Sequence, residues 1–390
     1  MKLVRSMSTV LILATAVAGL APLPSVAQQQ PSVSSVFATG LEAPRGLRFG
    51  PDGFLYVAEA GTGGSYGPAS PGYPTCAQVP GPFPGPYTGS STGGRISKIN
   101  HAGTRTTVAD TFPTTQDSGG DLMGVADVAF LNGTLYALVA GGGCSHGNPT
   151  SPSGIARVDR STGKWHLIAD IGAFVKAHPT KYESADDFEP DGSLYSLLAV
   201  DGALYTIEPN HGQLLSVTTG GAIQQVIDIS ASEGHIVPTS MAERHGSFYV
   251  GNLNLFPIDP QWARILTISR DGVESDVAPG FDAGRGNYRV VASKAGFTTV
   301  VAVDFGPDGL LYALEMSAAP GYPTPGAGKV VRVKRSGDIE EVVTGLVVPT
   351  GMTFGPDGWL YISNFGAIPA GTPLGLQSGQ ILRFYIPPGA

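Results

Sequence analysis

An octapeptide, Phe-Gly-Pro-Asp-Gly-x-Leu-Tyr, recurs along the chain and limits what the chain can fold into. In each copy an apolar run ends at Phe, Pro-Asp-Gly supplies a turn, and Leu-Tyr begins a second β-prone run, which predicts a β-hairpin. A single hairpin is unstable alone, so six copies predict a repeat architecture. Full copies occupy residues 49–56, 305–312 and 354–361, and degraded copies occupy 130–136, 200–205 and 245–249.

Two further β-prone runs follow each hairpin, so each repeat reads as four antiparallel strands, A to D. The sequence therefore predicts an all-β fold, a six-bladed β-propeller of four-stranded antiparallel blades. We expect strand C at 94–99, 154–158, 212–217, 263–268, 328–333 and 379–384, and strand D at 105–109, 164–170, 222–228, 272–277 and 338–343.

The sixth repeat lacks a strand D of its own, because the chain stops soon after its strand C. Residues 33–49 match residues 341–354, which contain strand D of the fifth repeat and strand A of the sixth. Residues 33–38 should therefore be the outer strand of the last blade. This pairing closes the ring and leaves no exposed sheet edge between the first and last blades.

Residues 1–27 have the pattern of a secretory signal peptide, with a basic start, an apolar stretch and Ser25-Val-Ala27 as a small-residue cleavage site. The apolar stretch is short for a membrane span, although an uncleaved N-terminal anchor is an alternative. We expect residues 28–390 to form one domain, secreted or periplasmic, with no membrane contact after cleavage.

The charge balance is acidic, with 23 basic and 31 acidic residues. Removing Lys2 and Arg5 with the signal peptide leaves 21 against 31, a net charge of −10. The sequence contains no basic run, which argues against nucleic acid or anionic lipid as a partner. We expect a monomer.

Cys76 and Cys144 are the two cysteines of the chain. An even pair in an exported protein predicts a disulfide. The two residues fall in the long loops of adjacent blades, so we expect Cα atoms within about 7 Å of each other.

The extra residues of the repeats fall between strands B and C, at 61–93, 141–153, 317–327 and 366–378. Because strands alternate in direction, these loops and the D-to-A connections share one face, which we call the long-loop face. The Pro-Asp-Gly turns occupy the opposite face, the turn face. Long loops on a rigid scaffold are a usual place for binding, so we expect a small molecule or a protein partner there. The alternative is that they are tolerated insertions.

An oxygen-bearing side chain stands three residues after the motif Tyr in five of the six repeats. Three carboxylates and two amides around one axis resemble the ligands that Ca²⁺ prefers, which predicts a possible calcium site. The alternative is that each side chain bonds to backbone N–H groups of the neighbouring blade. The five residues are Glu59, Glu208, Asn252, Glu315 and Asn364.

The residues that enter strand A should line the axial mouth of the propeller. Arg45 among carboxylates could orient an anionic or hydroxylated ligand, and His211 or His235 could act as a base. The expected mouth residues are Arg45, Asp121, Asp186, Asp187, Glu189, His235 and Thr350. The predicted ligand-binding residues are the five ring residues together with Arg45, His211 and His235.

Several segments resemble the ScyD/ScyE family, which is named for exported proteins encoded with the genes for the pigment scytonemin. They are Ala58-Glu-Ala-Gly-Thr-Gly-Gly64, Thr92-Gly-Gly-Arg-Ile-Ser-Lys-Ile99, residues 187–197 and the octapeptides. The resemblance spans nearly the whole mature chain and implies a secreted, TolB-like or NHL-like propeller, without implying catalytic residues. Two function classes remain open: a binding protein, and a Ca²⁺-dependent lactonase or esterase like the gluconolactonase-type propellers.

Overall fold

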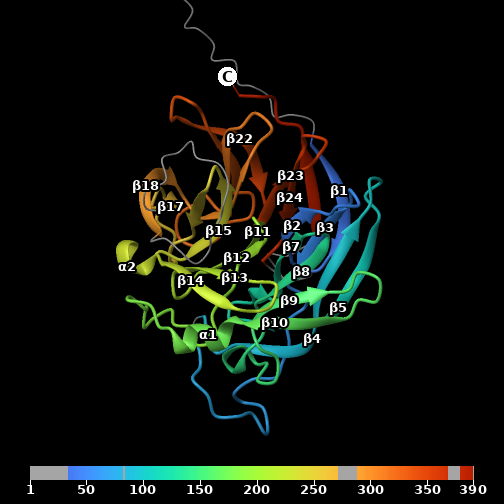
Figure 1. Ribbon diagram of the computed structural model, residues 1–390, viewed down its shortest axis with the longest axis vertical. Helices are drawn as coiled ribbons and strands as arrows, with labels where there is room; N and C mark the ends of the chain where they lie inside the picture. The colour runs from blue at the N-terminus through green and yellow to red at the C-terminus, as the bar shows by residue number, and fades with distance from the viewer. Residues whose placement is uncertain (1–33, 82–83, 271–287, 368–377, 390) are drawn as a thin grey trace, which may run out of the picture. The chain divides into compact units, whose positions relative to one another are not determined.

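The repeat of four β-runs forms six antiparallel sheets in the computed structural model, which describes residues 34–81, 84–270, 288–367 and 378–389. Figure 1 follows the chain colour from blade to blade around the ring. The expected signal peptide, residues 1–27, lies outside the described residues.

Each blade runs from an inner strand to an outer strand. In that order, blade one is β2 (Pro44–Phe49), β3 (Leu55–Glu59), β4 (Thr88–Ile99), β5 (Arg105–Gln116) and the short β6 (Leu122–Met123); blade two is β7 (Val125–Leu131), β8 (Thr134–Val139), β9 (Gly154–Val158) and β10 (Trp165–Asp170); blade three is β11 (Ser196–Val200), β12 (Ala203–Glu208), β13 (Gln213–Val217) and β14 (Ile223–Asp228). Blade four is β15 (Pro238–Arg244), β16 (Ser247–Asn252), β17 (Ala263–Arg270) and β18 (Tyr288–Phe297); blade five is β19 (Val300–Phe305), β20 (Leu311–Glu315), β21 (Gly328–Val333) and β22 (Ile339–Leu346); blade six is β23 (Gly351–Phe354), β24 (Leu360–Asn364), β25 (Gly379–Phe384) and β1 (Ser34–Leu41).

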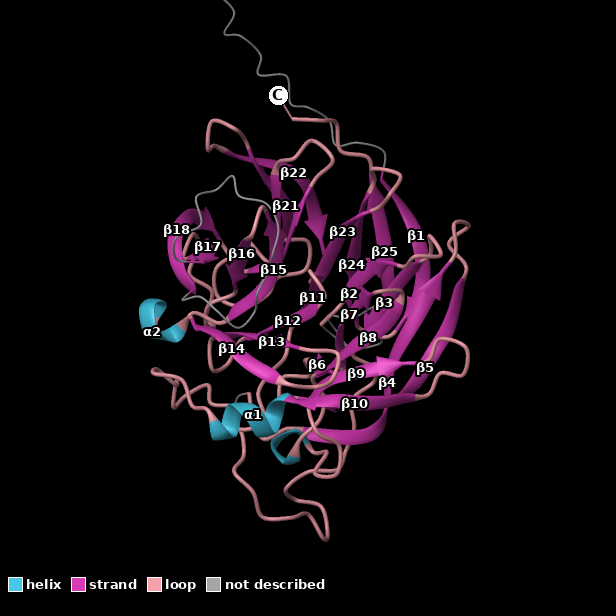
Figure 2. Ribbon diagram, in the orientation of Figure 1, coloured by secondary structure: helices cyan, strands magenta, loops and turns pink. Residues whose placement is uncertain are grey.

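The inner strands contact one another in sequence, from β2 through β7, β11, β15, β19 and β23 back to β2. Helix is a minor component of the described residues: α1 (Ile171–Ala177), α2 (Ser230–Glu233) and the 3₁₀ turn η1 (Cys144–His146) (Figure 2). All three fall in B-to-C or D-to-A connections, so they lie on the long-loop face. No described helix has the length and apolar character needed to cross a bilayer.

Ring closure follows the prediction. β1 pairs with β25 in antiparallel register, with Ser34 opposite Phe384 and Ala38 opposite Ile381. Val33, the first residue of the predicted strand, lies outside the described residues. The first and last strands of the fold therefore complete one sheet.

The hydrophobic core is divided among the interfaces between blades, with one principal cluster for each of the six. The octapeptide supplies part of this packing, because its Tyr meets the octapeptide Phe of the next blade edge-on. The ring centroids are 4.9 Å apart for Tyr56 and Phe130, and 4.9 Å for Tyr312 and Phe354. Such edge-to-face pairs are favourable beyond the area they bury.

Two predicted segments differ from the structure. The expected strand at 272–277 lies outside the described residues, and the outer strand of blade four is β18, at Tyr288–Phe297. The long loop of blade one ends at residue 87, not 93, because β4 and β5 continue as a hairpin beyond the rest of their sheet.

Candidate functional site

The axial mouth on the long-loop face brings a buried cation against a half-exposed carboxylate. Arg45, the second residue of β2, donates from Nη2 to Asp121 Oδ1 at 2.9 Å and also to the carbonyl oxygen of Leu122. The Arg45 side chain is 10% exposed and that of Asp121 is 49% exposed. The guanidinium therefore fixes one carboxylate oxygen, while part of the carboxylate faces solvent.

A second carboxylate, Asp117, lies in the same turn between β5 and β6. The backbone N–H of Asp121 donates to Asp117 Oδ1 at 2.7 Å, and the N–H of Asp117 donates to the carbonyl of Asp121. Burial, together with the charge of Asp121, raises the pKa of Asp117 to about 7. Asp117 can therefore accept or release a proton near neutral pH.

Tyr195, the residue immediately before β11, lies between the mouth and the channel along the axis. Its hydroxyl donates to the carbonyl oxygen of Thr350 at 3.1 Å, so it links blade three to blade six. Burial raises the pKa of Tyr195 to about 12, so the hydroxyl stays protonated. The channel beyond it has a volume of about 40 Å³, which is room for a few water molecules. A ligand at this mouth would lie on Tyr195 rather than inside the channel.

A buried polar cluster adjoins the mouth. Tyr87 donates to Glu189 Oε1 at 3.0 Å, and His146 Nε2 lies 3.3 Å from Glu189 Oε2. His146 Nδ1 lies 2.7 Å from the carbonyl oxygen of Gly142, which only accepts hydrogen bonds. Burial alone would lower the pKa of His146, but the hydrogen bond and charge of Glu189 raise it. These contacts fit a protonated imidazole paired with a carboxylate.

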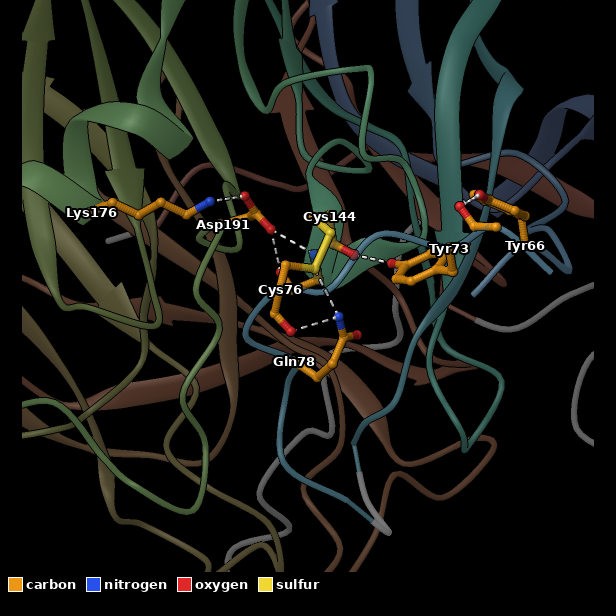
Figure 3. Close-up of a disulfide and its surroundings, with 9 residues drawn as sticks. Tyr66, Tyr73, Cys76, Gln78, Cys144, Lys176 and Asp191 are labelled. Carbon is orange, nitrogen blue, oxygen red and sulfur yellow. Dashed lines mark hydrogen bonds and ion pairs between the residues drawn. A yellow bond between two sulfur atoms is a disulfide. The ribbon is translucent and has the colours of Figure 1, made fainter. Parts of the chain in front are cut away.

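The predicted disulfide between Cys76 and Cys144 is present, with Cα atoms 6.4 Å apart. It joins the long loops of blades one and two (Figure 3), and Cys144 stands two residues before His146 of the polar cluster. The residue after Cys144, Ser145, donates from its N–H at 2.7 Å and its hydroxyl at 2.6 Å to Asp191 Oδ2. Asp191 also pairs with Lys176 of α1. The bridge is thus part of a series of contacts that connects three successive blades.

The ring residue Glu59 is fully buried and held by its surroundings. Its carboxylate accepts from the N–H of Glu42 at 2.6 Å, from Arg95 Nη2 at 2.5 Å and from the Ser97 hydroxyl. Glu42 belongs to the connection from β1 to β2. The side chain therefore joins the end of blade six to blade one.

Glu208 has the same role in blade three. It accepts from the N–H groups of Ser193 at 2.9 Å and His211 at 2.7 Å, and from His211 Nδ1 at 3.0 Å. Burial would raise the pKa of Glu208, but His211 and the amide donors lower it below the usual range. His211, predicted as a base, is 2% exposed and committed to this carboxylate.

The other ring residues are also engaged by the chain. Asn252 donates to the carbonyl oxygen of Ile236, in the connection before β15. Burial raises the pKa of Glu315, against the nearby charge of Lys329. Asn252 Oδ1 accepts from Arg264 N at 2.8 Å, Glu315 Oε2 lies 3.6 Å from Lys329 Nζ, and Asn364 Oδ1 accepts from Val347 N at 2.8 Å.

The ring does not present a common set of free oxygens to a calcium ion. Among the described residues, no group of three or more His, Cys, Asp and Glu side chains is placed to hold a metal. The contacts of Glu59, Glu208, Asn252 and Asn364 agree with the alternative of bonding to the backbone of the connections between blades, whereas Glu315 lies near Lys329 of its own blade. Calcium binding by these residues stays a prediction.

The remaining predicted mouth residues stand in three connections: Asp186, Asp187 and Glu189 between blades two and three, His235 between blades three and four, and Thr350 between blades five and six. His235 Nε2 lies 2.9 Å from Asp187 Oδ2, and Asp186 is exposed. Glu189 belongs to the polar cluster, and Thr350 takes part through its carbonyl. Asp117, Tyr87 and Tyr195 were not predicted, because they stand in connections of irregular length where the repeat gives no register.

The comparisons with known proteins support the fold. No family model and no curated protein matches the chain. Regucalcin from Agrobacterium tumefaciens, described as a calcium-binding protein, superimposes with a TM-score of 0.55 and 13% identity over 91% of this chain and 94% of its own. A proposed glucose dehydrogenase from Thermus thermophilus gives 0.51 and 15% over 90% and 99%, and a Bacteroides thetaiotaomicron protein of unknown function gives 0.53 and 10% over 91% and 76%. At these identities the similarity shows the fold alone: this chain is a six-bladed β-propeller.

Proposed function

We propose that the protein binds a small, hydroxyl-rich molecule at the axial mouth of its long-loop face. The observation that carries this proposal is Asp121, whose carboxylate is fixed by the buried Arg45 and is still half exposed. A carboxylate held in this way is a preorganised acceptor for the hydroxyl groups of a sugar or polyol.

The charges at the mouth favour a neutral ligand over an ionic one. Arg45 is already bonded to Asp121 and to a backbone carbonyl, so it offers little to an anion. Burial and the charge of Asp121 raise the pKa of Asp117 to about 7, and a protonated carboxyl can donate as well as accept a hydrogen bond. A mouth with both kinds of group matches hydroxyls, which are themselves donors and acceptors.

Export and membership of the ScyD/ScyE family belong to the same proposal. The disulfide between Cys76 and Cys144 supports an oxidising compartment, such as the periplasm or the extracellular space. The segments that resemble the family support the assignment, and the propeller fold agrees with it.

The second candidate function is hydrolysis of a lactone or ester, with Ca²⁺ as a possible cofactor. Asp117 favours it, since a base with a pKa of about 7 suits proton transfer at neutral pH. The description of regucalcin as calcium-binding supports a test for Ca²⁺. Metal analysis of the purified protein, followed by a lactone and ester screen, separates this candidate from simple binding.

The test of the binding proposal is calorimetric titration with a panel of neutral sugars and polyols. Asp121→Asn removes the acceptor charge and keeps the shape of the side chain, so it should weaken binding by about tenfold, or about 1.4 kcal/mol. Asp201→Asn is the matched control, since Asp201 is exposed in the β11–β12 turn on the opposite face. The proposal fails if no member of the panel binds, or if both variants behave alike.

A further inference from the structure

A groove of about 430 Å³ opens on the turn face of blade two, across the blade from the long-loop face. Its volume is within the range of small-molecule sites. Arg157 of β9, and Lys164 and His166 at the start of the outer strand, line it beside Trp165. These three nitrogen-bearing side chains are exposed, and none makes a hydrogen bond or ion pair with another described side chain. The pairing of β9 with β10 thus brings three basic side chains of the segment 157–166 into one groove.

The repeat shows what Arg157 lacks. Arg157 is paired with the motif residue Tyr136 on one side and with a residue of the outer strand on the other. In blade five the equivalent residue is Arg332, which is paired with the motif residue Tyr312 and with a residue of the outer strand β22. Arg332 lies 3.5 Å from Asp308, the Asp of the Pro-Asp-Gly turn, and 2.7 Å from Glu340 on the outer strand. Two carboxylates of the protein therefore neutralise this arginine.

Blade two has lost both carboxylates and kept the arginine. Asn132 stands four residues before Tyr136, where Asp308 stands before Tyr312. His166 lies opposite Arg157 in the β9–β10 register, where Glu340 lies opposite Arg332. An exposed arginine is left facing a histidine, with Lys164 nearby.

The other charged residues of the groove are already engaged. Asp159 accepts from the N–H and hydroxyl of Ser161, at 2.9 and 2.6 Å. Arg160 lies 3.6 Å from Asp52 of blade one and donates to the carbonyl oxygen of Gly133 at 3.4 Å. Among the described residues Asp159 makes no ion pair with Arg157, and Arg160 is itself a cation.

We propose that this groove binds a small dicarboxylate, whose two carboxylates take the places that Asp308 and Glu340 fill in blade five. Arg157 would bind one carboxylate through its guanidinium, and Lys164 and His166 would contact the other. Arginine recognises carboxylates with paired, directional hydrogen bonds. A cationic groove on a protein of negative net charge also concentrates anions locally.

The test is calorimetric titration of the full mature protein with malonate, succinate and glutarate, with acetate, sulfate and phosphate as comparison anions. At least one dicarboxylate should bind with saturation and at least tenfold more tightly than acetate. Arg157→Gln should abolish this binding. Arg335→Gln is the matched control, because Arg335 is an exposed arginine in the corresponding turn of blade five, and it should leave binding unchanged.

Asn132→Asp is a second test, because the turns of blades one, three, five and six carry Asp at the position four residues before the motif Tyr. Asn132 has a φ of 50°, a conformation that Asp also adopts readily, so the variant should fold. It should weaken dicarboxylate binding by tenfold or more and raise the melting temperature, since Arg157 gains an internal partner. The proposal is overturned if no dicarboxylate binds, if Asn132→Asp or Arg335→Gln behaves in the opposite way, or if sulfate and phosphate bind as tightly.

Discussion

Glu208 shows how much order one side chain can impose on a propeller. It is fully buried, and its two oxygens accept from backbone N–H groups of two different connections as well as from His211. A buried carboxylate with several donors is stabilising, whereas the same group without them would cost free energy. From the end of β12 it connects the segment before β11 to the segment after β12 through hydrogen bonds, and these bonds occupy both of its oxygens.

We predict that Glu208→Gln lowers the free energy of unfolding by about 1.5–3 kcal/mol, because an amide cannot replace the charge-assisted bonds. The loss should be the same with added Ca²⁺ and with EDTA, as measured by denaturant unfolding. His101→Ala, on the turn face, is the control and should change little. If Ca²⁺ stabilises the wild type and Glu208→Gln removes that response, the ring holds a metal after all.

His146 makes the stability of the protein depend on pH. Its pKa is raised in the folded state, so it contributes stability that is complete below the unfolded pKa of about 6.5 and is lost as the pH rises through the folded value. His211, whose pKa is raised mainly by Glu208 against the effect of burial, acts in the same direction.

We therefore expect the melting temperature to fall between about pH 6.5 and the alkaline side. His146→Gln should be less stable at pH 6 and should lose less as the pH rises. His166→Gln, an exposed histidine on the turn face, should keep the wild-type slope. Equal slopes for all three proteins would rule out His146 as the cause.

At the scale of elements, the disulfide fastens the longest described connection to its neighbour. Cys76 and Cys144 are 68 residues apart in sequence, and the closed loop includes the outer strands β4 to β6 of blade one and the inner strands β7 and β8 of blade two. The bridge holds η1 in place, and η1 carries the His146 and Ser145 side chains. Loss of the bridge should therefore affect both stability and the mouth.

We predict that the double variant Cys76→Ser, Cys144→Ser is destabilised by about 4 kcal/mol on the chain-entropy model. Binding at the axial mouth should weaken with it, while dicarboxylate binding on the turn face should persist. Thermal unfolding and calorimetry on the same samples would check both. A variant as stable as the wild type would show that the loops are ordered without the bridge.

The elements that repeat were predictable from the sequence, and those that do not repeat were not. The octapeptide predicted the A and B strands because its turn and its β-prone flanks are local features. Residues 188–195 spell Phe-Glu-Pro-Asp-Gly-Ser-Leu-Tyr, almost the same motif, yet they form a D-to-A connection. There Asp191 bonds Ser145 and Tyr195 reaches Thr350, whereas Asp52 bonds Tyr56 in the true hairpin at 2.8 Å.

The residues of the candidate site could likewise be predicted only where the repeat sets the strand register. Arg45 and Asp121 were predicted to share the mouth because strand register placed both at the start of inner strands. Asp117 and Tyr87 come from connections whose path depends on tertiary contacts, which no period of the sequence encodes. The basic groove was not predicted for a related reason: Arg157, Lys164 and His166 are close in sequence, but only the pairing of β9 with β10 places them in one groove.

At the scale of the whole molecule, the ring depends on a strand from the beginning of the chain. Ala38 and Leu41 of β1 are buried against blades six and one, at 4% and 1% exposed. Without β1, the edge of β25 and part of the blade-one interface would be open to solvent. Because each blade packs against the next around a closed ring, loss of β1 would destabilise the other blades as well as blade six.

We predict that a protein beginning at residue 42 is unfolded or aggregated, whereas one beginning at residue 31 melts like one beginning at residue 28. Circular dichroism and size-exclusion chromatography would compare the two. A cooperative, monomeric fold from the shorter chain would show that blade six does not need its outer strand.

The pairing of β1 with β25 also sets how the molecule would respond to a mechanical load on its ends. Ser34 and Phe384 lie directly opposite each other, so the strands leave the sheet at the same point. The tail after β25 is bonded to blade five, where Arg332 donates to the carbonyl oxygen of Pro387 and the N–H of Gly389 donates to Asp308. Once this tail is released, tension between the ends would act along the hydrogen bonds of one pair at a time. The seam would then peel open like a zipper at low force, and a strand pair loaded along its length would resist far more. A force that pulls on both ends of this chain would therefore act first on the pairing of its first and last strands, the point at which the ring is closed.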